Sequence, residues 1–585
     1  MVVFYGGVVA WLTWPLAAHL RTHLAITDPI ARFEVPLVAW TLAWESHALV
    51  TAPLRLADAN IYHPAPHALF YGPTAYGALP YFMPTFLLTG DPALSLNVMF
   101  LACLALTATA LHLVVHRWTG SHLGGFVAAW TFLTTPWLLW GQGPGAEPNY
   151  AVLQYFPFIV LVTAEPLHSV GGMLGLVALV ILQGAANPVY IAPAVFVPLV
   201  VVALGRLVRR STRASAFRLL AAIIVAAIAL GVLHAGHLVV RAENPHLAVQ
   251  TYWTRPSSTQ LMWGPLVYGP TAIARASALI VLVGAAIFTR RLLADRALAR
   301  RRAWTHATLW AVIGFLISVP PIGMWGDTRI VFPHLRLAAW AGVYGLVREP
   351  SRLGVASLTG LALLAGLGFA ECTRSWARRR AIASGLAAIL AVTMYAEYAR
   401  GFCLRLPALP CESARPLPQS YPLMTATRAA PGIYDVVRER GGPLVELPFA
   451  VPGTTDVLDV PAAHARAMYR SIFHWRPILN GYSGFWPERF PVRIALARRL
   501  PDPQVLAALR QETGLAMIVV HLADFAHPEP ELEYAIGSPS RPSPFAPGAA
   551  LAEREVWATI ADRGGTDALR LVARDGDDLL FAVVE

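Results

Sequence analysis

Asp28 is the first residue whose type and position could do chemistry in this sequence. It follows an uncharged apolar run, residues 1–18, by about ten residues, and it lies in a segment, residues 19–92, that is too polar to span a membrane. A carboxylate just beyond a hydrophobic run can act as a general base toward a hydroxyl group at a membrane surface. Asp91, at the far end of the same segment, is the second candidate base. Both aspartates precede proline, so a helix-boundary or turn role is the alternative for each.

A loop within this segment, residues 58–74, is a candidate wall for a substrate cavity. Three prolines and a glycine predict a rigid non-helical backbone there. The residues that this loop presents are Asp58, Tyr62, His63 and His67. Interfacial aromatic rings and solvated imidazoles are the alternative interpretation. The spacing of the two histidines is weak evidence for metal ligands. We therefore predict no metal site, and the need for a divalent ion stays open.

Residues 34–50, just before that loop, carry apolar groups at helical spacing. Trp40 and Trp44 lie four residues apart, which places them on one face of a helix. The pattern predicts a helix that lies in the membrane interface with its aromatic rings at headgroup depth.

Arginine side chains could bind a phosphate group, because a guanidinium group contacts phosphate oxygens in a bidentate manner. Arg348 and Arg352 lie four residues apart before an apolar run, and Arg255 lies between aromatic residues and a proline. These three are the candidate phosphate ligands. Headgroup anchoring, or pairing of Arg348 with Glu349, is the alternative.

The elements that must position these residues are membrane spans. The chain is 56% hydrophobic and 14% charged, with a mean hydropathy of +0.53, which indicates a polytopic membrane protein. A spanning helix needs about 20 apolar residues. About eleven candidate spans follow from the apolar runs: 1–18, 93–115, 123–140, 150–164, 171–185, 187–205, 217–240, 271–289, 303–319, 353–372 and 381–399.

Basic residues orient the predicted bundle. The sequence has no lysine, so all 45 basic residues are arginine, and fifteen of them form three clusters at 206–218, 290–302 and 374–380. With eleven spans these clusters share one side, which the positive-inside rule assigns to the cytoplasm together with the N-terminus. The first run lacks a basic flank and a clean cleavage pattern, so we expect an uncleaved span. The pI of about 9.7 reflects topology and contact with anionic membrane lipid, and it does not indicate nucleic-acid binding.

The hydropathy falls near residue 400. Residues 1–400, with the first outer loop 19–92, are therefore predicted to form the transmembrane domain, and residues 401–585 a soluble extracytoplasmic domain of α/β or α+β class. Strands are expected at 443–449, 516–521 and 579–584, and helices at 433–440 and 503–513. Cys403 and Cys411 could form a disulfide in an oxidising compartment, although spacing alone does not give the required geometry.

A glycine-rich and aromatic loop in this second domain, residues 480–487, is a candidate acceptor-binding loop. Its sequence is NGYSGFWP, and Asn480, Tyr482 and Trp486 are the side chains suited to contact a glycan. A structural turn that docks the domain onto the bundle is the alternative.

Several of these stretches resemble bacterial GT-C type integral-membrane glycosyltransferases. The likeness is carried by Asp28-Pro29, the Trp40 to Trp44 helix and ADANIYHPAP (57–66), and by LVREPSRL (346–353), PILNGYSGFWP (477–487) and AMIVVH (516–521). The resemblance implies an enzyme of the bacterial inner membrane. Such an enzyme transfers a sugar from a polyprenyl-phosphate-linked donor to a glycan, lipid or protein acceptor of the cell envelope. It also implies that an acid of the first outer loop activates the acceptor hydroxyl, and Asp28 is the matching position.

Two other classes remain open at this stage. A catalytically inactive GT-C-like protein could act as a scaffold in envelope glycan synthesis, because fold alone does not establish activity. A transporter or lipid flippase would concentrate ionisable residues inside its spans, whereas the charges here lie mostly in loops. The sequence lacks a phosphate-binding glycine loop, which argues against a soluble nucleotide-sugar site.

Overall fold

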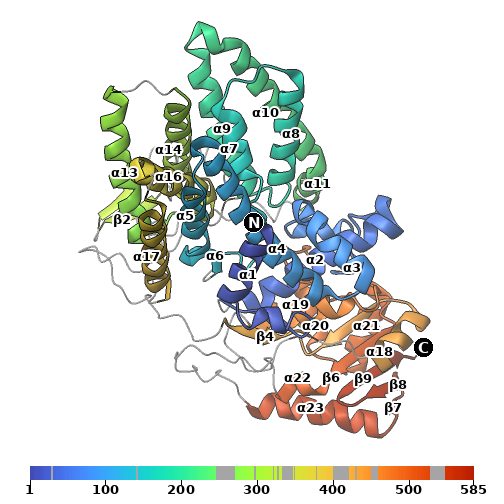
Figure 1. Cartoon of the computed structure of the whole chain (residues 1–585). Coiled ribbons are helices and arrows are strands. Elements are labelled where there is room, and N and C mark those ends of the chain that lie inside the picture. The colour runs from blue at the N-terminus through green and yellow to red at the C-terminus, as the bar shows by residue number, and fades with distance from the viewer. Residues whose placement is uncertain are drawn as a thin grey trace.

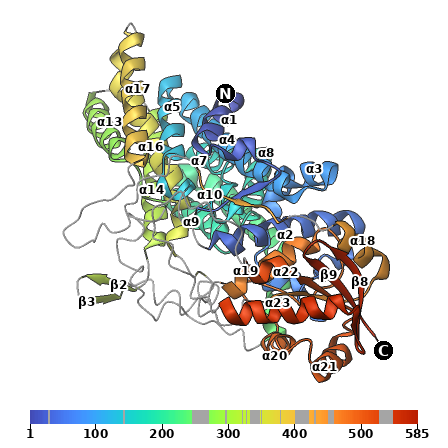
Figure 2. The same ribbon diagram turned by 90° about the horizontal axis from the view of Figure 1, so that it is seen from below.

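The computed structural model describes residues 1–27, 30–139, 143–244, 270–294, 298–319, 322–325, 328–331, 347, 350–376, 379–399, 421–427, 431–449, 459–526 and 547–584. Helices before residue 400 form a bundle, and the orange and red segment after residue 421 lies at one end of it (Figure 1). The same arrangement is visible from below (Figure 2). Five residues singled out in the sequence lie outside the described residues: Asp28, Arg255, Arg348, Cys403 and Cys411.

A helix lies in each predicted span, although several are short. The bundle helices are α1 (Val2–Leu12), α4 (Pro92–Thr119), α5 (His122–Leu133), α6 (Pro136–Leu139), α7 (Phe156–Ala164), α8 (Val170–Gly184), α9 (Ile191–Leu207), α10 (Arg213–Leu233), α11 (Ala235–Glu243), α13 (Arg275–Ala294), α14 (Leu298–Ser318), α16 (Val355–Thr373) and α17 (Arg380–Ala399). Within the described part of the chain, four helical segments are both long and apolar enough to cross a membrane: 92–119, 210–233, 350–376 and 380–399. The count of about eleven spans therefore stays a prediction.

The structure brings the three arginine clusters to one end of the bundle. Arg206 donates to the backbone oxygen of Glu165 at 2.8 Å, and Arg302 forms an ion pair with the Glu165 carboxylate. Arg291 pairs with Glu371 at 2.9 Å, and the third cluster begins three residues after Glu371. Their common side agrees with the sequence prediction, and the compartment that this side faces stays a prediction.

The segment after residue 421 contains a five-stranded sheet in the order β5-β6-β9-β8-β7. Its strands are β5 (Leu444–Leu447), β6 (Met517–His521), β7 (Gly565–Thr566), β8 (Leu569–Asp575) and β9 (Asp578–Val583), and only the β5/β6 pair is parallel. The accompanying helices are α18 (Pro431–Arg440), α19 (Asp459–Ser471), α20 (Phe490–Ala497), α21 (Pro503–Thr513), α22 (Leu522–Ala526) and α23 (Pro547–Asp562). The three predicted strands and two predicted helices are confirmed. β2 (Ile322–Trp325) and β3 (Thr328–Val331) form a separate antiparallel pair.

This segment is joined to the first loop by backbone pairing. β1 (His23–Ala25) pairs antiparallel with β4 (Leu423–Thr425), so strands about four hundred residues apart in sequence form one ribbon. The two sides of the predicted boundary at residue 400 therefore differ in hydropathy, but they contact each other through this ribbon. The division into two domains stays a prediction.

The helix predicted for residues 34–50 exists as α2 (Ala31–Thr51), but its environment differs from the expectation. Trp40 is 2% exposed, and its indole N–H donates to the Asn60 side-chain oxygen at 3.1 Å. α19 packs on α2, and the Trp44 ring lies 6.0 Å from that of Trp475. The prediction that Trp40 reaches the headgroups is wrong, because segments distant in sequence cover this helix.

Candidate active site

The chain on either side of Asp28 contacts two elements that carry acids. A Cβ built on Gly145 would lie 2.7 Å from the Thr27 side chain, so glycine is needed for the loop of residues 143–151 to approach Thr27. Ile30, on the other side, packs with Phe33 against Tyr482. The backbone flanking Asp28 thus lies between the loop that carries Glu147 and the predicted acceptor loop.

Glu147 forms a buried ion pair with Arg352. The Arg352 Nη2 lies 2.5 Å from Glu147 Oε1, and Nη1 donates to the Tyr150 hydroxyl at 3.3 Å. The guanidinium carbon lies 5.3 Å from the ring centroids of both Tyr150 and Tyr190, within the range of cation–π attraction. Glu147 and Arg352 are only 9% and 8% exposed. Arg352 belongs to a 3₁₀ turn (Pro350–Gly354) that leads into α16, so a helix entrance fixes its backbone.

Two buried polar atoms beside this pair have no hydrogen-bond partner within the described residues. They are Nε of Arg352 and Oδ1 of Asn149. A buried donor left without an acceptor costs free energy, so a site that leaves one open is suited to a ligand oxygen. This observation is compatible with phosphate binding at Arg352.

Glu34 and Tyr482 connect the first loop with the predicted acceptor loop. The Tyr482 hydroxyl donates to Glu34 Oε1 at 2.9 Å, and the Phe33 ring meets the Tyr482 ring edge-on at 5.1 Å. Burial raises the pKa of Tyr482, and the charges of Glu34 and Glu147 raise it further. The phenol therefore stays protonated and acts as a donor at neutral pH.

The predicted substrate loop presents fewer groups to solvent than expected. Tyr62 is 1% exposed, and its hydroxyl lies 2.9 Å from the Ser483 hydroxyl. His63 Nε2 lies 3.1 Å from the Thr513 carbonyl oxygen. Asp58 is exposed and accepts a hydrogen bond from the His67 backbone N–H, and His67 itself is partly exposed. The loop thus docks the acceptor loop through Tyr62, while Asp58 and His67 remain accessible.

Backbone hydrogen bonds also join the predicted substrate loop to the predicted acceptor loop. Ile478 N donates to the Asn60 carbonyl at 2.8 Å, and Tyr62 N donates to the Asn480 carbonyl at 3.0 Å. A Cβ on Gly481 would lie 2.3 Å from the Tyr62 ring, so glycine is required at this contact. The loop of residues 476–486 is therefore held against the loop of residues 58–74.

Asn480 anchors the same loop to the sheet. Its Nδ2 donates to the Glu446 carbonyl, and its Oδ1 accepts from the Glu446 N–H, each at 2.9 Å. Asn480 is fully buried, whereas Trp486 is 47% exposed. Within the predicted acceptor set, Asn480 therefore holds the loop, and Trp486 is the side chain with an exposed ring.

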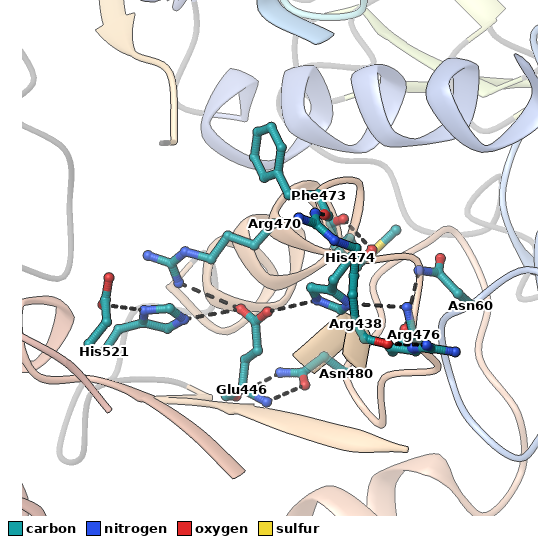
Figure 3. Close-up of polar contacts among 12 residues, drawn as sticks. Asn60, Arg438, Glu446, Arg470, Phe473, His474, Arg476, Asn480 and His521 are labelled. Atoms are coloured by element: carbon teal, nitrogen blue, oxygen red, sulfur yellow. Dashed lines mark hydrogen bonds and ion pairs between the residues drawn. The ribbon is translucent and has the colours of Figure 1, made fainter. Parts of the chain in front are cut away.

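The Glu446 carboxylate lies at the centre of a buried charged network (Figure 3). Its Oε2 is 3.2 Å from His521 Nε2 and 3.9 Å from Arg470 Nη1, and its Oε1 is 3.6 Å from His474 Nε2. His521 also contacts Asp578, with 2.6 Å between Nδ1 and Oδ1. These residues come from β5, β6, α19, the turn that follows α19 and the first residue of β9. The network joins the sheet to the base of the acceptor loop.

Opposing effects set the charge states in this network. Burial alone would raise the pKa of Glu446, but the imidazoles of His474 and His521 and the charge of Arg470 lower it to about 2. Burial and Arg470 act to lower the pKa of His521, yet contacts with Asp578 and Glu446 raise it above its usual value. The carboxylate is therefore ionised at neutral pH, and its charge is compensated inside the protein.

Asp91 has a structural position in this arrangement. Its side chain caps α4 by accepting from the Leu94 N–H at 2.9 Å, and it pairs with Arg21 at 3.2 Å. An aspartate before proline at a helix start is a favoured cap. The geometry thus gives Asp91 a helix-capping role.

The described residues contain no group of three His, Cys, Asp or Glu side chains that could hold a metal ion.

Solved structures with a similar arrangement of helices and strands identify the fold. No family model matches the sequence, and no curated protein matches it. The arabinofuranosyltransferase AftD from Mycobacteria superposes on the whole chain with a TM-score of 0.54 at 13% sequence identity. The chain has the GT-C fold.

The match to AftD covers 100% of this chain but 40% of that protein, so the chain spans about two fifths of the length of its structural relative. The oligosaccharyltransferase of Archaeoglobus fulgidus matches 90% of this chain and 68% of its own, with 11% identity and a TM-score of 0.42. Both are GT-C membrane glycosyltransferases. The likeness to AftD shows the GT-C fold alone.

Sequence reasoning missed Glu34, Glu147 and Glu446 as members of these clusters. One signal was available for Glu147, because it is the only charged residue between the apolar runs that end at 140 and begin at 150. An isolated charge in a short loop between spans requires a partner or a function. The other two could not be found, since their partners lie far away in sequence.

Proposed function

We propose that this protein is a membrane glycosyltransferase. In this proposal it transfers a sugar from a polyprenyl-phosphate-linked donor to a cell-envelope acceptor, with Asp28 as general base. The observation that carries the proposal is the buried Glu147–Arg352 ion pair. The loop that carries Glu147 contacts Thr27, the residue before Asp28, at Gly145. The GT-C fold over the whole chain supports the same reaction class.

The reaction needs a base on one side of the anomeric carbon and a cation on the other. Asp28 takes the proton of the acceptor hydroxyl as that oxygen forms its bond to the anomeric carbon. The bond from that carbon to the phosphate oxygen breaks, and its electron pair leaves with the polyprenyl phosphate. Because a phosphate is already a good leaving group, no strong general acid is required. The logic is that of an inverting glycosidase with a hydroxyl group in place of water.

Arg352 is the proposed cation for the leaving phosphate. Its position before α16 is set by a 3₁₀ turn, and Glu147 with two tyrosine rings fixes the plane of its guanidinium. A fixed donor costs little reorganisation when charge develops on the phosphate. Nε supplies a donor that no described residue uses. Arg348 and Arg255, outside the described residues, complete the proposed donor-phosphate set.

The acceptor is proposed to bind between the first outer loop and residues 476–486. Trp486 offers an exposed ring for a sugar face, and Tyr482 contributes a protonated hydroxyl next to Glu34. Asp58 and His67 are the accessible polar groups of the substrate loop. The proposal leaves glycan, lipid and protein acceptors as possible classes.

The same proposal places the protein in the bacterial inner membrane. The end that carries the arginine clusters then faces the cytoplasm, as the positive-inside rule requires. The sheet and the loop of residues 476–486 then lie outside, where a lipid-linked donor is available. Residues 401–585 are accordingly proposed as the extracytoplasmic part.

Transfer by the purified full-length protein tests the proposal. The protein is reconstituted in liposomes with a labelled pool of polyprenyl-phosphate sugars and a cell-wall acceptor fraction from a deletion strain. We expect labelled product that mass spectrometry identifies as a new glycosidic linkage. Movement of the labelled lipid between leaflets without any new linkage would instead support a flippase, and the absence of both would support a scaffold.

A further inference from the structure

A groove between α4 and α7 lies away from the candidate active site. It has a volume of about 480 Å³ and is lined by Leu113, His116, Arg117, Phe158 and Leu161. His116 and Arg117 lie three and four residues after Leu113, so both are neighbours of Leu113 on the surface of that helix. The two α7 residues lie three apart and form the apolar opposite wall. The groove thus combines an apolar surface with two basic side chains at the end of α4.

The basic side chains of this groove have unused hydrogen-bonding capacity. Arg117 is exposed and makes no ion pair with any residue that the structure describes. The Nδ1 atom of His116 is buried and has no hydrogen-bond partner in the same part of the chain. The His116 ring stacks on His122 at 3.9 Å with 11° between the planes, which fixes its orientation. A ligand with anionic oxygens would satisfy both groups.

The position of the groove indicates the source of such a ligand. α7 ends at Ala164, and the next residue, Glu165, contacts Arg206 and Arg302. The groove therefore lies near the end of the bundle where all three arginine clusters gather. Clustered arginine next to a membrane attracts anionic lipid.

We propose that this groove binds one anionic phospholipid of the leaflet at the arginine-rich end. The headgroup phosphate accepts hydrogen bonds from Arg117 and His116, because guanidinium groups bind phosphate oxygens strongly. An acyl chain lies along Leu113, Phe158 and Leu161. The charge at the groove favours an anionic lipid over a zwitterionic one, and the apolar walls favour a lipid over free phosphate.

Native mass spectrometry of the full-length protein released from nanodiscs tests this assignment. We expect retained phosphatidylglycerol in preference to phosphatidylcholine of the same acyl chains. Arg117→Gln is expected to lower phosphatidylglycerol binding about fivefold, the equivalent of about 1 kcal/mol per basic side chain at a membrane surface. Arg209→Gln, which changes an exposed arginine at the same end but outside the groove, is the matched control and is expected to retain the lipid.

Thermal unfolding in the two lipids supplies a second measurement that does not depend on the variant's basal stability. Phosphatidylglycerol should raise the unfolding temperature of the wild type and of Arg209→Gln more than that of Arg117→Gln. Equal retention and equal stabilisation for both variants would overturn the proposal. Equal binding of both lipids by the wild type, or binding of inorganic phosphate with no lipid, would also overturn it.

Discussion

Removing one partner of the Glu147–Arg352 pair is the perturbation that the structure makes most informative. Glu147→Gln leaves a cation that is 8% exposed without its counterion, and Arg352→Met leaves a carboxylate that is 9% exposed without its own. Breaking a buried ion pair from one side costs about 3–5 kcal/mol, because the remaining charge is desolvated and uncompensated. We expect each single variant to lose about that much free energy of unfolding.

The double variant, Glu147→Leu with Arg352→Met, separates stability from catalysis. Replacing both charges by apolar side chains of similar volume is often neutral for stability. In a double-mutant cycle of Glu147→Leu, Arg352→Met and the double variant, the double variant should therefore be more stable than either single one, so the two losses of stability should be far from additive. Sugar transfer should nevertheless stay at least about a hundredfold below the wild type, since the leaving phosphate has lost its cation.

Denaturant-induced unfolding of the purified protein in detergent measures the stability terms, and the liposome assay measures transfer. A double variant that regains both stability and transfer would refute the phosphate-binding role of Arg352. Single variants as stable as the wild type would show that the pair is not buried as described.

Other contacts give predictions of the same kind. Asn480→Ala removes both hydrogen bonds to the Glu446 backbone and should cost about 1–3 kcal/mol, measured by denaturant unfolding. Glu446→Gln should destabilise the protein at pH 7, and the difference should disappear as the pH falls from about 4.5 toward about 2, because the folded-state pKa is lowered and the ionised form supplies the stability. Gly481→Ala should impair folding or docking of the acceptor loop, seen as faster proteolysis, because its Cβ would meet the Tyr62 ring at 2.3 Å. Asp91→Asn should leave stability and transfer nearly unchanged, because asparagine caps a helix as well as aspartate.

Controls for these variants follow from the same contacts. Gly175→Ala places a Cβ where no atom lies within 4 Å, so it should fold normally where Gly481→Ala does not. Asp91→Ala removes the cap and should cost about 1 kcal/mol, without a specific loss of transfer. A glutamine variant at position 446 whose stability deficit is the same at pH 7 and pH 2 would contradict the ionised network.

The sequence was sufficient to predict those helices and strands that have a clear hydrophobic pattern of their own. The strand ending at His521 and the helix beginning at Pro503 were predicted because apolar runs and helical spacing are local signals. The common side of the arginine clusters was also predictable, since an even number of spans separates them. The short length of α1 was not, because hydropathy does not show where the helix of an apolar run ends.

The candidate site depended on contacts that no local pattern contains. Arg352 was identified as a basic residue at a span entrance, but its partner, Glu147, lies about two hundred residues earlier. Trp40 has the spacing of an interfacial helix, but its helix is covered by α19, more than four hundred residues later, and its indole N–H is bonded to Asn60. Asn480 was assigned to ligand contact because it is polar, whereas the structure uses both ends of its amide to hold Glu446.

The central claim is that Asp28 removes the proton of the acceptor hydroxyl. The direct measurement is the initial rate of sugar transfer by Asp28→Asn, compared with the wild type and with Asp91→Asn at equal amounts of folded protein. A general base contributes about 10²- to 10⁴-fold to a rate, so transfer by Asp28→Asn should fall by at least about a hundredfold, while Asp91→Asn stays near the wild-type rate. Transfer by Asp28→Asn at the wild-type rate would contradict the account.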